Sequence, residues 1–142
     1  MTGPVLVTGA TGKTGRRVCE HLEAAGHAVR RGSRSGPVHF DWFDTTTHPV
    51  VVDGVSAAYL VAPFGPTELL PVMRPLVDRL LDQGVDRIVL LSAASLERGG
   101  PMMGKVHDYL ATHAPRWTVL RPSWFMQNLS EAQHLNPIRE RG

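Results

Sequence analysis

The chain has 142 residues and a formal net charge of +2, with 42% hydrophobic and 20% charged residues. These values fit a soluble globular protein of one domain that is long enough to bury a core. The sequence contains no basic run and no apolar stretch of membrane-spanning length, so neither nucleic-acid binding nor membrane insertion is expected. The first residues lack the charged and apolar regions of a secretory signal, which favours a cytoplasmic location.

Strand-like and helix-like segments alternate along the chain. Residues 5–8 form a short apolar run, typical of a strand buried on both faces of a sheet. Residues 16–25 follow with apolar side chains on one helical face, and Gly26 is a helix stop signal. The same patterns predict further strands at 27–31, 38–41, 57–61, 88–91 and 117–120, and further helices at 45–52, 69–81 and 102–113.

This succession predicts a single α/β domain over residues 1–142, a doubly wound Rossmann-type parallel sheet with helices on both faces. Right-handed crossovers place the carboxyl ends of all the strands on one edge, and ligands bind there at the switch point of the strand order. Five residues fall at predicted strand ends: Thr8, Ser33, Ala62, Ser92 and Arg121.

The most informative motif is Thr8-Gly9-Ala10-Thr11-Gly12-Lys13-Thr14-Gly15, between the first strand and the first helix. The N–H groups of such a turn and the dipole of the next helix favour a bound phosphate, which glycines allow to approach closely. A nucleoside-triphosphate loop is the rival interpretation, but it needs a glycine where the chain has Val7 and leaves Gly15 unexplained. The dinucleotide interpretation is favoured, with cofactor contacts expected from Gly9, Thr11, Gly12, Lys13, Thr14 and Gly15.

The region after the second strand indicates which dinucleotide is preferred. Rossmann domains that prefer NAD place an acidic residue there for the ribose hydroxyls, but this chain has no acidic residue between Glu23 and Asp41. Arg34 is expected to contact the 2′-phosphate of NADP(H), with Ser33 assisting, because the guanidinium offers a planar set of donors. A solvated basic loop is an equal alternative for Arg34 and the favoured one for Arg30 and Arg31. NADP(H) is therefore the expected cofactor, with NAD(H) as the alternative.

Cysteine and histidine give no sign of a disulfide or a metal site. The single Cys19 excludes an internal disulfide and lies at helical spacing beside Val18 and Leu22, as a small buried hydrophobe does. The seven histidines are scattered without short ligand spacing, so no metal is expected.

Three further stretches strengthen the glycine motif: Phe40-Asp41-Trp42-Phe43-Asp44, Ala58-Tyr59-Leu60-Val61-Ala62-Pro63 and Leu120-Arg121-Pro122-Ser123-Trp124-Phe125-Met126-Gln127-Asn128. Together they resemble the NmrA-like branch of the atypical short-chain dehydrogenase/reductases, near the ergot-alkaloid-type reductases. The resemblance implies a strand order of 3-2-1-4-5-6. Members of that family continue well past this length and build much of the substrate pocket there, so the chain is expected to be the N-terminal portion of the pattern, without that substrate part.

The resemblance also suggests residues near the nicotinamide, but it fixes no catalytic residue. Related enzymes often keep a serine where this chain has Ser92, although a hydroxyl that caps a turn is an equal alternative. Lys105 lies near the catalytic lysine of some relatives, and an exposed surface lysine is the favoured alternative. The Tyr-x-x-x-Lys pair of other short-chain enzymes is absent. The loops after the strands add three expected cofactor contacts: Ala62, Pro63 and Pro122.

Two classes of function follow. The first is an NADPH-dependent oxidoreductase, or its cofactor-binding part, in which the nicotinamide transfers hydride to an unidentified small molecule. The second is a non-catalytic sensor or regulatory protein that binds NAD(P). The short chain alone is expected to be a poor catalyst, and apolar surface near Trp124, Phe125 and Leu129 favours self-association, so a homo-oligomer stays open as an alternative.

Overall fold

A computed structural model describes residues 3–123, and these form a six-stranded sheet in the order β3-β2-β1-β4-β5-β6. Every neighbouring pair of strands is parallel. The predicted fold class and strand order are therefore confirmed. Trp124, Phe125, Asn128 and Leu129, which belong to the last motif and the stretch after it, lie outside the described residues.

All the predicted strands and helices are present, with shifted ends. The strands are β1 (Val5–Thr8), β2 (Val29–Ser33), β3 (Val38–His39), β4 (Ala57–Leu60), β5 (Arg87–Leu91) and β6 (Arg116–Leu120). The helices are α1 (Lys13–Ala24), α2 (His48–Val52), α3 (Leu70–Asp82) and α4 (Met103–His113), and the 3-10 turn η1 (Thr45–Thr47) precedes α2.

Two boundaries differ from the predictions for local reasons. Helix α1 begins at Lys13 rather than at Arg16, because Gly12 is its extended N-cap residue, with φ −79° and ψ 180°. Strand β2 begins at Val29 rather than at His27, because the His27 N–H still bonds to the Leu22 carbonyl as part of the turn that ends α1. Both shifts come from hydrogen bonds at a helix end, which apolar periodicity does not report.

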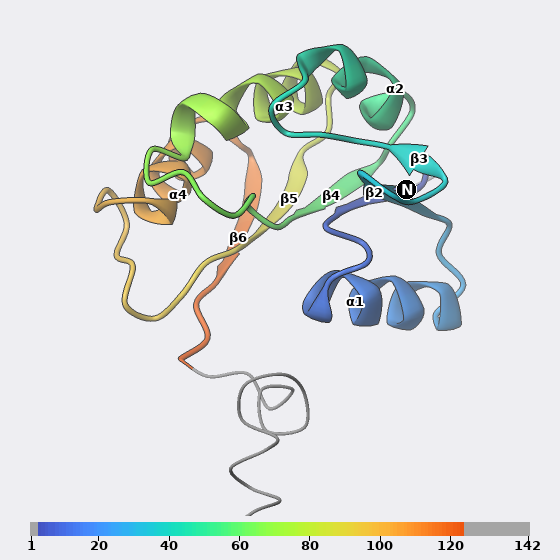
Figure 1. Cartoon of the computed structure of the whole chain (residues 1–142), viewed down its shortest axis with the longest axis horizontal. Helices are drawn as coiled ribbons and strands as arrows, with labels where there is room; N and C mark the ends of the chain where they lie inside the picture. The colour runs from blue at the N-terminus through green and yellow to red at the C-terminus, as the bar shows by residue number, and fades with distance from the viewer. Residues whose placement is uncertain (1–2, 124–142) are drawn as a thin grey trace, which may run out of the picture.

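The helices divide unequally between the two faces of the sheet. Figure 1 shows α2, α3 and α4 on one face and α1 on the other. Right-handed crossovers require this division, because the chain moves one way from β1 to β3 and the other way from β3 to β6. The larger core cluster lies under α2 to α4 and includes Leu60, Met73 and Leu90. The smaller cluster lies under α1 and includes the fully buried Cys19, as predicted.

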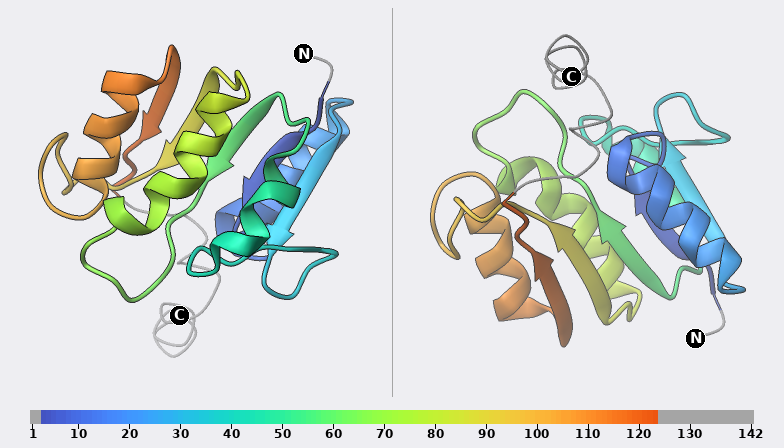
Figure 2. Two further views of the ribbon diagram at one scale, coloured as in Figure 1. Left: turned by 90° about the horizontal axis from the view of Figure 1, so that it is seen from above. Right: turned by 90° about the horizontal axis from the view of Figure 1, so that it is seen from below.

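The sheet face under α1 is only partly covered. In the right panel of Figure 2, α1 lies over the β1 side of the sheet, and no other described helix covers this face toward β5 and β6. Leu91 is half-buried there, and Leu120 is 44% exposed. None of the described helices combines the length and apolarity needed to cross a bilayer.

Candidate dinucleotide-binding site

The glycine turn joins β1 directly to α1. Thr8 ends β1 in the core, Gly9 turns the chain with φ +63°, and the Gly12 N–H donates to the Gly9 carbonyl over 2.9 Å. Gly12 is exposed and receives no side-chain cap, so the first N–H groups of α1 open at the carboxyl edge of the sheet. A helix start of this kind attracts an anion through its N–H groups and its dipole.

The three glycines have different physical roles. Gly9 has a positive φ, which glycine adopts without strain. A Cβ on Gly15 would lie 2.1 Å from the Gly9 carbonyl oxygen, so only glycine lets α1 pack this closely on the turn. A Cβ on Gly12 would lie 3.3 Å from the same oxygen and would project from an exposed position at the helix start. These are the turn, packing and approach roles expected of this motif.

The other predicted contacts gather at the same edge, because every strand ends there. Ser33 ends β2, Ser92 follows β5, and Ala62 and Pro63 follow β4. The hydroxyls of Ser33 and Ser92 are both buried and have no hydrogen-bond partner among the described residues. The Ser92 hydroxyl therefore does not cap a turn, although its N–H donates to the Leu120 carbonyl. Buried polar atoms without partners are uncommon and call for a ligand, a water or an ion.

The arginines near β2 separate into structural and available groups. Arg30 donates to the Val51 carbonyl over 3.0 Å, and Arg31 donates from Nε to the Glu23 carboxylate over 3.1 Å. The solvated-loop interpretation was wrong for both, because they lie in β2 and bond to α2 and α1. Arg34 is exposed directly after β2, at the carboxyl edge. Of these three arginines, Arg34 is the one whose side chain has no structural role within residues 3–123 and lies exposed at this edge.

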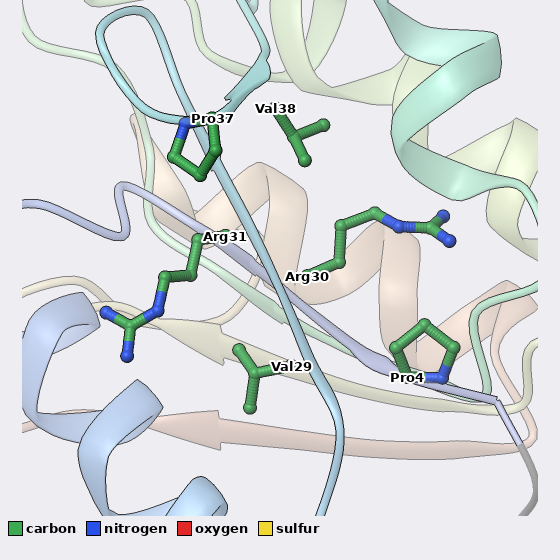
Figure 3. Close-up of a pocket in the computed structure, with 6 residues that line it drawn as sticks. All are labelled: Pro4, Val29, Arg30, Arg31, Pro37 and Val38. Carbon is green, nitrogen blue, oxygen red and sulfur yellow. The ribbon is translucent and has the colours of Figure 1, made fainter.

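A pocket of about 340 Å³ opens beside β2. Figure 3 shows Arg30 and Arg31 leaving the strand in opposite directions at this pocket. Their alternation follows from the period of a strand, and each guanidinium already has a protein partner. Pro4 and Val29 lie at the amino ends of β1 and β2, so this pocket lies away from the carboxyl edge that carries the glycine turn.

A second, larger hollow of about 670 Å³ lies between α1 and the ends of β5 and β6. Thr14, Tyr59, Leu120 and Pro122 are among the residues that line it. The Thr14 side chain hydrogen-bonds to the Tyr59 hydroxyl, and burial raises the pKa of that tyrosine. The structure thus turns Thr14 toward this groove and places Pro122 at its edge, whereas Thr11 is exposed in the turn.

Two other expected residues lie at helix starts. Lys13 opens α1 and its carbonyl accepts a hydrogen bond of 2.7 Å from Arg17. Lys105 lies in the first turn of α4 and is exposed, whereas the next two residues, Val106 and His107, are buried. The structure thus agrees with the favoured interpretation of Lys105 as a surface lysine. In residues 3–123, no group of three or more metal-ligating side chains could hold a metal ion.

The loop after β3 contains residues whose role the sequence did not reveal. Trp42 is buried, and its indole N–H donates to the Val61 carbonyl over 3.1 Å, just after β4. The Asp41 N–H donates to the Thr47 hydroxyl, and His48 Nε2 donates to the Asp41 carbonyl, both over 3.1 Å. The only sequence signal was the aromatic motif that contains Trp42, which indicates a family but no contact.

His48 makes the stability of this loop depend on pH. Burial lowers the pKa of His48, so the folded protein holds the imidazole neutral. In the unfolded chain the same group takes up a proton near its ordinary value of about 6.5. Between the lowered folded pKa and this value, the unfolded state binds more protons, so the free energy of unfolding decreases as the pH falls.

We expect this decrease below about pH 6.5, at no more than about 1.4 kcal/mol per pH unit from His48. His48→Gln keeps a donor near the Asp41 carbonyl but does not titrate, so its stability should decrease less. Burial also lowers the pKa of His107, but that group is present in both proteins. Urea unfolding of both at about pH 7.5 and about pH 5 tests this, and equal decreases would exclude a contribution from His48.

The fold and the site together define a Rossmann domain with a glycine turn at its switch point. The chain is also similar in sequence to known oxidoreductases. The chain is 35% identical to the uncharacterized oxidoreductase YesF of Bacillus subtilis over 98% of its own length and 51% of that protein. It is 39% identical to agroclavine dehydrogenase of Claviceps fusiformis over 89% of its length and 48% of that protein. No family model matches the chain.

A solved structure supports the same fold. The triphenylmethane reductase of Citrobacter sp., complexed with NADP(H), aligns with a TM-score of 0.73 at 23% identity, over 98% of this chain and 55% of the reductase. These relatives agree with the resemblance of the sequence to the NmrA-like branch of the atypical short-chain dehydrogenase/reductases. The chain spans about half the length of the curated relatives that it matches.

Proposed function

We propose that NADP(H) binds along the carboxyl edge of the sheet, across the glycine turn and the strand ends that together form the cofactor crevice, and that the chain is the cofactor-binding part of an NAD(P)H-dependent oxidoreductase. One observation carries the proposal: the exposed start of α1 lies at an edge where the buried hydroxyls of Ser33 and Ser92 have no partner among the described residues. An anion at the helix start and donors or acceptors on the rest of the dinucleotide would satisfy these groups.

The names of similar proteins support the proposed class of enzyme and the proposed cofactor. Festuclavine dehydrogenase of Aspergillus fumigatus is 38% identical over 96% of this chain and 52% of that protein. The NADPH-dependent quinone oxidoreductase QOR2 of Escherichia coli, solved with NADPH, aligns with a TM-score of 0.65 at 19% identity, over 89% of this chain and 51% of that one. Both names describe oxidoreductases, and the second describes the cofactor proposed here.

The residues divide along the dinucleotide according to the strand that carries them. The turn from Gly9 to Lys13 and the buried Gly15 hold the pyrophosphate against the helix start. Ser33 and Arg34, after β2, hold the ribose with its 2′-phosphate. Ala62, Pro63, Ser92 and Pro122, after β4, β5 and β6, lie on the nicotinamide side. The bound nicotinamide supplies the hydride, and these residues bind and orient it.

A binding protein without turnover is the second candidate, and the state of the tyrosines favours it. The chain has two tyrosines, and each hydroxyl has a side-chain hydrogen-bond partner within the domain. The Tyr59 hydroxyl bonds to Thr14, and the Tyr109 hydroxyl donates to the Asp78 carboxylate. NADPH oxidation by this chain extended with the C-terminal half of a relative, measured with a panel of imines, enones and quinones, separates the two candidates, because only an oxidoreductase shows saturable turnover.

The proposed cofactor preference depends on Arg34. We expect Arg34→Ala to weaken NADPH binding about tenfold or more and NADH binding by less than about threefold, because only NADPH presents a 2′-phosphate to the guanidinium. Calorimetric titration with each cofactor measures the ratio. Arg87→Ala is the matched control, because it removes an exposed arginine from the amino end of β5, at the opposite edge. An unchanged ratio in Arg34→Ala would remove this residue from the site.

A further inference from the structure

We propose that Trp42 is a positioning residue for the cofactor, acting through the backbone of Val61. Its indole fastens the loop after β3 to the end of β4, and this fixes two walls of the crevice relative to the glycine turn. The inference rests on the proposed function, because it assigns Trp42 a part in binding the same dinucleotide. Trp42 itself is 7% exposed and acts from behind the crevice.

Val61 is the point at which three segments of the edge meet. Its N–H donates to the Thr8 hydroxyl over 2.8 Å, at the end of β1. Its carbonyl accepts from the Trp42 indole over 3.1 Å. Its side chain lies 3.3 Å from the place where a Cβ would stand on Gly9. The position of Val61 therefore fixes the glycine turn on one side and the adjoining contacts, Ala62 and Pro63, on the other.

The loop that carries Trp42 is itself held firmly. The Asp41 peptide is bonded on both sides by Thr47 and His48, from η1 and α2. Phe40 packs edge-on against the indole, with ring centroids 5.0 Å apart. Trp42 thus transmits the position of η1 and α2 to the β4 end. A site that is fixed before binding loses less conformational freedom on binding, which raises affinity.

Two variants separate positioning from packing. Trp42→Phe keeps an aromatic ring but deletes the N–H that reaches Val61. Phe40→Leu perturbs the same aromatic cluster and deletes no hydrogen bond to Val61. We expect Trp42→Phe to raise the Kd for NADPH about fivefold, as loss of one buried hydrogen bond implies, and Phe40→Leu to raise it less than about twofold at a similar loss of melting temperature. Exchange of the Val61 amide hydrogen should also accelerate in Trp42→Phe but not in Phe40→Leu.

The outcomes distinguish this inference from the proposed function. If the unaltered chain does not bind NADPH, the proposed function fails. If it does bind, equal affinities for NADPH in Trp42→Phe and Phe40→Leu overturn the positioning role of Trp42 and leave the proposed function standing. If Trp42→Phe does not fold, Thr8→Val serves as the test, because it releases the Val61 N–H from the other side and predicts the same weakening. Unchanged affinity in a folded Thr8→Val would then refute the inference.

Discussion

Replacing Gly12 with valine is expected to weaken NADPH binding about 100-fold or more while the domain stays folded. Gly12 is exposed at the start of α1, and its backbone is in the extended region that any residue adopts. A valine there would project its methyl groups over the N–H groups that are proposed to hold the pyrophosphate, so the phosphate could not approach. Calorimetric titration of the unaltered chain and the variant measures the loss.

The control for this prediction adds the same side chain at the other end of the helix. Ala24→Val lies in the exposed last turn of α1, where valine costs only a little helix propensity. It should bind NADPH as the unaltered chain does. Gly12→Ala should show an intermediate loss, because its single methyl group covers less of the helix start. Equal binding by Gly12→Val and the unaltered chain would show that the dinucleotide binds elsewhere.

Replacing Gly15 with alanine is expected to reduce the free energy of unfolding by about 3 kcal/mol, the upper end of the cost of overpacking. The new Cβ would lie 2.1 Å from the Gly9 carbonyl oxygen and 2.8 Å from its carbon, so α1 would have to move away from the turn. These are backbone atoms, which cannot rotate aside. The gain in helix propensity from alanine, about 1 kcal/mol, offsets only part of the clash.

Urea unfolding compares this variant with Gly26→Ala. Gly26 has φ +90° but no atom within 4 Å of its Cβ position, so alanine there meets backbone strain without a clash. We expect it to cost only about 1–2 kcal/mol. A cost for Gly15→Ala no greater than that for Gly26→Ala would show that close packing of α1 on the turn is not why glycine occupies position 15.

Apolar periodicity and glycine stop signals were sufficient to locate the strands and helices of this chain. Short apolar runs gave the strands, and Gly26 and Gly84 marked where the first and third helices end. The exact starts of α1 and β2 were not predictable in this way. They depend on which backbone N–H finds which carbonyl, as at Gly12 and His27, and a residue pattern does not contain that geometry.

The candidate site shows the same division. The positions of the glycines in the turn could be predicted from the sequence, because each must satisfy a local steric condition. The roles of the arginines could not be predicted in this way, because charge alone does not distinguish a phosphate ligand from a structural hydrogen-bond donor. Arg30 bonds to a carbonyl 21 residues away and Arg31 to a carboxylate 8 residues away, whereas Arg34 stays at the exposed edge. Burial and partners, which separate these roles, are properties of the folded chain.

The sequence by itself determined the alternation of strands and helices and the position of the glycine turn, because both follow from interactions between near neighbours. Only the tertiary structure decided how the edge is held together. The Trp42 indole meets a carbonyl 19 residues away, and the Thr8 hydroxyl meets an N–H 53 residues away. Those pairs exist because the crossovers bring β1, β4 and the loop after β3 to one edge, and no local pattern specifies which donors and acceptors then face each other.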